Sequence, residues 1–236
     1  MTTDYRTRLY EAYASTHAGV SVVASSEHAF RRDILPHLPD DRRAAVVDLG
    51  CGQGQLVAQL LRHGYQGAWG IDASPEQVSL AHAAGIAQVR QGDFREALAS
   101  ASIDVATATD LFEHLSKDEA LGAMDAVFAA LRPSGRAILR VPNGVSPFVG
   151  NFQHGDLTHE TTYTARSLRQ LGAAAGFSVT TVHACPPVRH SIKSGLRVGA
   201  WKAASGLMKL ALAAETGQLR GHLVTQNVVA VMVKSQ

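Results

Sequence analysis

Short apolar runs alternate with stretches of helical periodicity between about residues 45 and 145. The runs near 46–49, 68–72, 87–91, 103–108 and 137–141 have the length and composition of buried strands. Strands that alternate with helices predict right-handed βαβ units and a mostly parallel sheet. Two more strands are predicted at 177–182 and 225–233. The pattern therefore predicts the α/β class, with a doubly wound, seven-stranded, mostly parallel sheet and ligands beyond the carboxyl ends of its strands.

Two segments lie outside this alternation. Residues 1–43 carry aromatic and aliphatic side chains at spacings that fit two helices, and Pro36 and Pro39 mark the link to the first strand. About 40 residues separate the last two strands, which is far more than a hairpin needs. We therefore predict a single domain over 1–236, with a helical cap over 1–43, a core over 44–185 and 222–236, and a helical insertion over 186–221.

The insertion has an amphipathic pattern over residues 192–214. One face of the helical wheel is apolar, and Arg197, Lys202 and Lys209 interrupt the segment too often for a bilayer span. The apolar face consists of Ile192, Leu196, Ala200, Ala203, Leu207, Leu210 and Ala214. Three interpretations stay open, in this order: a lid over the site, and then equally a dimer contact or a peripheral anchor on anionic lipid.

Charge is divided unevenly along the chain. Residues 161–236 carry nine basic residues and the single acid Glu215, a formal charge of +8, against −6 for residues 1–160. This split indicates an anionic partner for the last third, such as a phosphorylated acceptor or a lipid surface, or else only a solvated basic face. The first residues contain no apolar segment, and Cys51 and Cys185 suggest no disulfide framework, so we expect a cytoplasmic protein, peripheral at the membrane if the segment 192–214 is an anchor.

The stretch from Asp48 to Gly54 predicts a strand, a tight turn and the start of a helix. Its glycines let a ligand approach the backbone, and the helix start offers N–H groups to a phosphate or a carboxylate. A dinucleotide-binding fingerprint requires a third glycine at position 55, which is Gln55 here. The turn is therefore not of the dehydrogenase type.

The pattern Asp48-x-Gly50-x-Gly52-x-Gly54, followed by Asp72 and Gly92-Asp93-Phe94, resembles the S-adenosylmethionine-dependent methyltransferases of the Rossmann-like class. The resemblance implies S-adenosyl-L-methionine as cofactor, with Asp72 on the ribose, Asp93 on the adenine amine and Asp48 beneath the amino-acid end. The cofactor-binding set that it implies is Asp48, Gly50, Cys51, Gly52, Gly54, Asp72, Ala73, Gly92, Asp93, Phe94 and Asp110.

Methyl transfer to a hydroxyl requires a base near the methyl group. His114, in the segment from Asp110 to His114, is one candidate, and its other interpretation is a residue that shapes the cofactor pocket or caps the next helix. The favoured candidate is His159, with Asp156 orienting it, although Asp156 or Thr158 could equally be a turn residue. The predicted catalytic set is therefore His159, Asp156 and His114.

A metal site at His154, Asp156 and His159 has adequate ligands, but the spacing matches no strong metal motif, so no metal is predicted. A pattern over residues 156–177 resembles methyltransferases of bacterial glycan and natural-product pathways. It consists of Asp156-x-x-His159, Tyr163-Thr164 and then Leu168-x-x-Leu171-x-x-Ala174-x-x-Phe177. The predicted reaction is O-methylation of a hydroxyl on a small-molecule or glycan acceptor, by in-line displacement with a His base. The alternatives are N-methylation of a small amine, or cofactor binding without turnover.

A nucleic-acid substrate is not expected. The basic residues of the last third cluster with apolar residues and lack the interleaved aromatic residues of a strand-binding groove. The segment after the fourth strand, Asp110-Leu111-Phe112-Glu113, is also not the Asn/Asp-Pro-Pro-aromatic motif of exocyclic-amine methylation.

Overall fold

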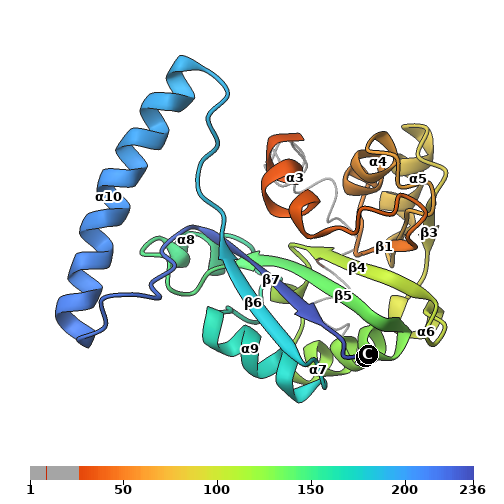
Figure 1. Ribbon diagram of the computed structural model, residues 1–236. Helices are drawn as coiled ribbons and strands as arrows, with labels where there is room; N and C mark the ends of the chain where they lie inside the picture. The colour runs from red at the N-terminus through yellow and green to blue at the C-terminus, as the bar shows by residue number, and fades with distance from the viewer. Residues whose placement is uncertain (1–8, 10–26) are drawn as a thin grey trace.

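The computed structural model describes Leu9 and residues 27–236, and the predicted first helix around Tyr5 to Tyr13 falls mostly outside these residues. The described strands form one sheet in the order β3-β2-β1-β4-β5-β7-β6 (Figure 1). The strands are β1 (Val46–Leu49), β2 (Trp69–Asp72), β3 (Val89–Gln91), β4 (Ile103–Thr109), β5 (Leu131–Pro142), β6 (Val179–Ala184) and β7 (Asn227–Val233). The predicted seven-stranded α/β fold is confirmed.

The order of the strands creates a switch point. From β1 the chain moves outward through β2 to β3 and then returns to β4, which pairs with the other side of β1. The pairs among β1 to β5 are parallel, and β7 runs antiparallel between β5 and β6. Ligands of doubly wound sheets bind where the strand order reverses, so the carboxyl ends of β1 and β4 are the expected location of a site.

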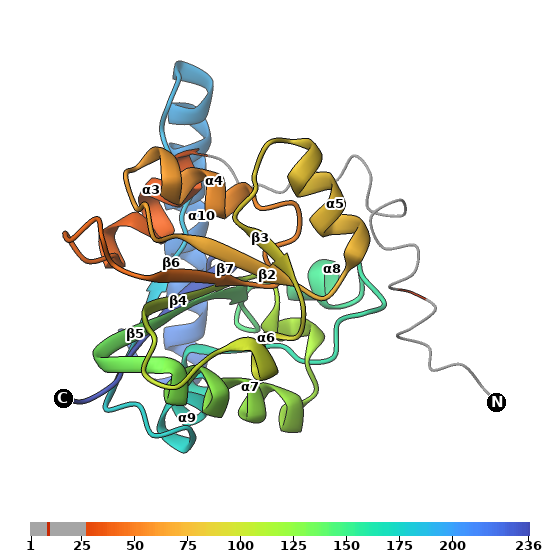
Figure 2. The same cartoon turned by 90° about the vertical axis from the view of Figure 1, so that its right-hand side faces the viewer.

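Helices cover both faces of the sheet (Figure 2). One face carries α3 (Glu27–Asp33), α4 (Gln55–Arg62) and α5 (Pro75–Ala83), and the other carries α6 (Phe94–Ala97), α7 (Lys117–Ala130) and α9 (Ala165–Ala174). All four residues of β1 are buried, as expected for a strand covered on both sides. Phe30 and Leu60 pack in the core of the first face, and Met124 lies in the core of the second.

Several boundaries differ from the prediction. The strand predicted near 137–141 is longer in the structure, because residues 132–135 also lie within β5, where the register with β4 shifts and Ser134 has a φ of 65°. The interruption is therefore a bulge, which keeps the strand in the sheet. The segment 111–115 is predicted to lead into a helix, and it does so through the 3₁₀ turn η3 (Phe112–His114), after which Ser116 caps α7 with a capping box.

The insertion before the last strand forms the helix α10 (Ile192–Thr216), which begins at the cap Ser191 and ends at Gly217. The helix stands away from the sheet and from the helices that cover its two faces (Figure 1), and only Ser194 and Ala213 of its residues are buried. The predicted apolar strip faces solvent, with Leu196 72% and Leu207 71% exposed. Among the described helices, none is both long enough and apolar enough to cross a bilayer.

The remaining short elements are η2 (Leu35–His37) and α8 (Val149–Gln153). Just after η2, the carbonyl of Pro39 accepts a hydrogen bond of 2.7 Å from the hydroxyl of Tyr65, which joins the cap region to the core. The second follows β5 and begins the loop that carries His159. This loop therefore leaves the carboxyl edge of the sheet, as the sequence predicts.

Candidate active site

The glycine turn after β1 has the geometry that its sequence predicts. Gly50, Gly52 and Gly54 all have positive φ values, between 52° and 75°, and Gly54 is the residue from which α4 starts. A Cβ on Gly50 would lie 2.8 Å from Leu111 Cδ1, so the leucine side chain would have to shift, and the φ of 60° strains any other residue at this position. The same contact places the turn directly beside the segment that follows β4.

Asp72 ends β2 and faces this turn. Its carboxylate accepts hydrogen bonds of 2.8 Å from the backbone N–H groups of Gly52 and Ser74. Burial raises the pKa of Asp72, while these two hydrogen bonds lower it in part. A carboxylate has about four lone-pair sites, so both oxygens retain capacity for the hydroxyls of a ligand.

Asp48 lies beneath the turn in the middle of the sheet. The residue is 3% exposed, and the hydroxyl of Thr107 donates a hydrogen bond of 2.8 Å to its carboxylate. Burial raises the pKa of Asp48 to about 7, and the charge of Asp72 adds to the increase. Burial likewise raises the pKa of the Cys51 thiol, which makes this cysteine a poor nucleophile.

The turn from Gly92 to Phe94 closes the same side of the crevice. The backbone N–H of Gly92 donates to the carbonyl of Asp72 at 3.0 Å, which ties this turn to the end of β2. Asp93 caps α6 and forms an ion pair with Arg95, and the hydrogen bond from Arg95 lowers the pKa of Asp93. Phe94 is half-buried, whereas the predicted cofactor residue Ala73 is exposed.

These residues fit S-adenosylmethionine. Within the described part of the chain, the only atom within 4 Å of a Cβ built on Gly52 is Gln77 Oε1 at 3.9 Å, so the backbone is open to a ligand. Gln77 Oε1 and Thr109 Oγ1 are both buried without a hydrogen-bond partner among the described residues. Unsatisfied polar atoms around an open glycine turn are the environment that a polar ligand completes.

Asp110, the last of the predicted cofactor residues, has an uncommon backbone conformation, with a φ of 53°. Both of its carboxylate oxygens accept from Arg140 Nη1 at 2.6 Å. Arg140 is 5% exposed, and its Nε lies 3.6 Å from Asp33 of α3. The sequence signal for this ion pair is the single arginine within the apolar run 137–141 of β5.

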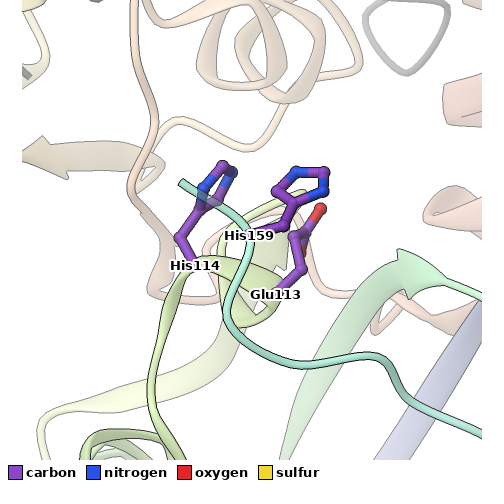
Figure 3. Close-up of side chains that lie close together, drawn as sticks. All are labelled: Glu113, His114 and His159. Atoms are coloured by element: carbon purple, nitrogen blue, oxygen red, sulfur yellow. The ribbon is translucent and has the colours of Figure 1, made fainter. Parts of the chain in front are cut away.

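Three side chains that can bind protons or metals meet just beyond Asp110: Glu113 and His114 from η3, and His159 from the loop after α8 (Figure 3). One ligand atom from each of them lies within 4.8 Å of the other two. The rings of His114 and His159 make an edge contact with centroids 4.7 Å apart. We call these three residues the Glu113–His114–His159 cluster.

Hydrogen bonds fix the orientation of both imidazoles. The hydroxyl of Thr158 donates to Asp156 at 2.6 Å, so its oxygen accepts from Nδ1–H of His114 at 2.8 Å. The carbonyl of Phe152 accepts from Nδ1–H of His159, also at 2.8 Å. In the neutral form of each ring the unprotonated nitrogen is therefore Nε2.

The carboxylates of this region differ in their ionisation. Glu113 is 2% exposed, and burial, followed by the charge of Asp110, raises its pKa well above the ordinary value. Burial opposes ionisation of Asp156 too, but hydrogen bonds from Thr158 and the nearby histidines lower its pKa overall. The pKa values of these two carboxyl groups are therefore shifted in opposite directions.

The predicted catalytic residues come together, but with different partners. The sequence predicts that Asp156 orients His159, whereas the Asp156 carboxylate accepts from Thr158, which holds His114. Asp156 meets His159 through the backbone, where its carbonyl accepts from the His159 N–H at 3.3 Å. The other interpretation of Asp156, as a turn residue, describes its bond to the Thr158 backbone at 2.8 Å. His154 is exposed, and the three-residue cluster contains Glu113 in place of His154 and Asp156.

Comparison with known proteins agrees with this architecture. Residues 24–182 match the model of a methyltransferase domain family, and the chain belongs to that family. The glycine turn and the acids at three strand ends, which in the sequence resemble the S-adenosylmethionine-dependent methyltransferases of the Rossmann-like class, all lie within the matched residues.

Two curated relatives are trans-aconitate 2-methyltransferases. The protein from Azoarcus sp. (strain BH72) is 33% identical over 114 residues, which is 47% of this chain and 44% of the relative. The protein from Deinococcus radiodurans is 30% identical over 160 residues, which is 66% of this chain and 57% of the relative. The chain thus spans about half the length of the curated relatives that it matches.

Solved structures share the fold at lower sequence identity. A methyltransferase from Archaeoglobus fulgidus superposes with a TM-score of 0.68 at 16% identity, over 95% of this chain and 99% of that one. A Haemonchus contortus phosphoethanolamine N-methyltransferase in complex with S-adenosyl-L-methionine gives 0.64 at 16% identity, over 100% of this chain and 59% of that one. These similarities support the fold.

Proposed function

We propose that the protein transfers a methyl group from S-adenosylmethionine to a hydroxyl oxygen of a small acceptor that binds over the Glu113–His114–His159 cluster. The observation that carries this proposal is the pair of imidazoles beside the glycine turn, each oriented with Nε2 as its unprotonated nitrogen. When bound, the cofactor supplies a methyl carbon that is activated by the adjacent sulfonium. The residues of the cluster position the acceptor oxygen and remove its proton.

A hydroxyl acceptor explains why titratable groups gather at this point. An alcohol is a poor nucleophile until its proton leaves, whereas a neutral amine already has a lone pair. Asp156 acts on His114 through Thr158 and is therefore a positioning residue. In the metal-free protein His159 Nε2 is the base that we favour, with the Phe152 carbonyl as its orienting partner.

Methyl-ester formation on a carboxylate is the second candidate, because the curated relatives are named for trans-aconitate, a polycarboxylate. This reaction would need no base. The charges near the cluster oppose a polyanion, since the pKa of Asp156 is lowered and the buried Arg140 is already paired with Asp110.

The basic helix supports a further part of the proposal, contact with an anionic surface. Its apolar strip is exposed, and Lys193, Arg197, Lys202 and Lys209 accompany that strip with Glu215 as the only acid of the helix. A basic amphipathic helix of this kind favours binding in the plane of an anionic lipid surface. A lid over the acceptor and a dimer contact are the alternatives.

The test is a transfer assay with methyl-labelled S-adenosylmethionine and three acceptor classes: hydroxylated small molecules and sugars, trans-aconitate, and small amines. Label that resists mild alkali and depends on a hydroxyl supports the proposal. Alkali-labile label on trans-aconitate would assign ester formation instead, and label on the amines alone would assign N-methylation. Tight S-adenosylhomocysteine binding without transfer to any of the three classes would favour a cofactor-binding protein without turnover.

A further inference from the structure

The loop that carries His159 is fixed to η3 by the backbone. The N–H groups of Glu160 and Thr161 both donate to the carbonyl of Glu113, at 2.7 and 3.0 Å. The hydroxyl of Thr161 also donates to the carbonyl of Leu115 at 3.0 Å. These bonds hold the loop against the end of β4, so the meeting of His159 with Glu113 and His114 is built into the backbone.

Glu113 is an unusual buried acid. Its Oε2 is inaccessible to solvent and has no hydrogen-bond partner among the described residues. A buried carboxylate oxygen without a donor costs free energy, and such a group is expected to meet a proton, a donor or a cation. Arg140, the nearest buried cation of the region, donates instead to Asp110.

The two histidines have the outer hydrogen bonds of metal ligands. Histidines that bind a metal through one nitrogen almost always donate the other N–H to a carboxylate, a backbone carbonyl or a water. His159 donates Nδ1–H to the Phe152 carbonyl, and His114 donates Nδ1–H to Thr158, which is bonded to Asp156. Both rings therefore present Nε2 as the nitrogen for ligation.

We propose that Glu113, His114 and His159 bind one divalent transition-metal ion, Zn²⁺ or an ion of similar ligand preference. Two imidazoles and one carboxylate suit such ions better than Mg²⁺, which prefers oxygen ligands. In a tetrahedral site with ligands at about 2.1 Å from the ion, the ligand atoms lie about 3.4 Å apart. The separation of up to 4.8 Å therefore has to contract when the ion binds, by at most about 1.4 Å for any pair.

Three protein ligands leave positions for the acceptor, and this step rests on the proposed O-methylation. A hydroxyl bound to the ion loses its proton to water at a lower pH than a free alcohol does. The oxygen keeps the electron pair of the broken O–H bond and forms the bond to the methyl carbon. The C–S bond breaks with its pair returning to sulfur, which yields S-adenosylhomocysteine. With the ion bound, both imidazoles serve as ligands and the ion replaces the base.

The first experiment measures metal binding without any acceptor. Protein dialysed against EDTA and then freed of chelator is titrated with Zn²⁺ by calorimetry and with Co²⁺ by visible absorption. We expect one equivalent bound, with absorption typical of a low-coordinate Co²⁺ site. His159→Ala should weaken binding by at least 100-fold, and Thr158→Val, which removes an outer hydrogen bond, by about 10- to 100-fold. The control His154→Ala changes an exposed histidine of the same loop and should bind as the unmodified protein does.

The outcomes separate this proposal from the proposed function. Folded protein that binds no Zn²⁺, or that loses binding in His154→Ala but not in His159→Ala, overturns the metal site. If the variant Glu113→Gln fails to fold, Zn²⁺ binding by His159→Ala and Thr158→Val still tests the metal site, because Thr158→Val keeps all three ligands. Equal hydroxyl methylation with and without EDTA would also overturn the metal proposal while leaving the proposed function intact. Metal binding without hydroxyl methylation would retain the site and end the proposed function.

Discussion

The two sides of the carboxyl edge are built in different ways. On the side of β1 and β2, a glycine turn offers its backbone N–H groups, as in the bond from the Gly52 N–H to the carboxylate of Asp72 at the end of the next strand. On the side of β4, side chains 44 positions apart meet, as in the bond between His114 and Thr158. The conformation of the glycine turn depends on adjacent residues of the sequence, whereas the side-chain contacts at the end of β4 form only once the chain has folded. We therefore expect substitutions on the two sides to have separable effects.

The largest expected effect is on turnover. His159→Ala should lower the rate of hydroxyl methylation by about 10²- to 10⁴-fold, because it removes a group that activates the acceptor. The dissociation constant of S-adenosylhomocysteine should stay unchanged, since His159 lies on the other side of the edge. Initial rates and calorimetry measure the two quantities, with His154→Ala as the matched control. A parallel loss of cofactor affinity would show that the two sides are coupled.

The complementary change is Asp72→Asn, which should weaken S-adenosylhomocysteine binding by about 100-fold. The reason is that the ligand loses its charge-assisted hydrogen bonds to the carboxylate. Binding of Zn²⁺ to the Glu113–His114–His159 cluster should persist in this variant. Calorimetry of both ligands on one preparation gives the comparison. Cofactor affinity equal to that of the unmodified protein would remove Asp72 from the site.

Substitutions in α10 test whether this helix binds an anionic surface independently of both sides of the carboxyl edge. Charge removal by Lys202→Gln with Lys209→Gln should weaken binding to phosphatidylserine vesicles by about 30-fold, from about 1 kcal/mol for each lysine. Lys117→Gln, an exposed lysine on α7, is the control. Sedimentation with vesicles and light scattering without them separate lipid binding from dimer formation. A change in the oligomeric state instead of vesicle binding would assign the helix to a dimer contact.

The smallest expected effect concerns stability on the backbone-built side. Because burial raises the pKa of Asp48 from 3.8 to about 7, the folded protein retains a proton that the unfolded chain loses between these values. The group therefore destabilises the fold progressively as pH rises through this window, and by a constant amount above it. Asp48→Asn removes this destabilisation. At pH 8 it should raise the melting temperature by about 2–4 °C for each kcal/mol by which the ionisable Asp48 destabilises the fold, and near pH 4 it should give no gain.

Melting curves at several pH values, with and without S-adenosylhomocysteine, check this expectation. Asn retains an oxygen that accepts from the Thr107 hydroxyl, so the hydrogen bond of the core is preserved. A gain that is the same at every pH would mean that ionisation of Asp48 does not limit stability.

The difference between the two sides also explains which parts of the fold and of the site can be predicted from the sequence. Strand alternation and the glycines at 50, 52 and 54 predict the sheet and the cofactor turn because turn geometry depends on adjacent residues. Glu113 is visible beside His114, but its burial and its meeting with His159 depend on how the loop after α8 returns to η3. The pairing of Arg140 with Asp110 likewise needs the parallel register of β4 and β5.

The placement of β7 has a consequence for the order in which the sheet forms. The described pairing of β6 is with β7, which is synthesised only after the whole of α10. While the ribosome is making α10, β6 therefore has no strand to pair with, and β5 lacks a neighbour on the same side. Both become protected together when β7 inserts between them, so an arrest of translation within α10 should leave two open sheet edges, which are prone to intermolecular pairing.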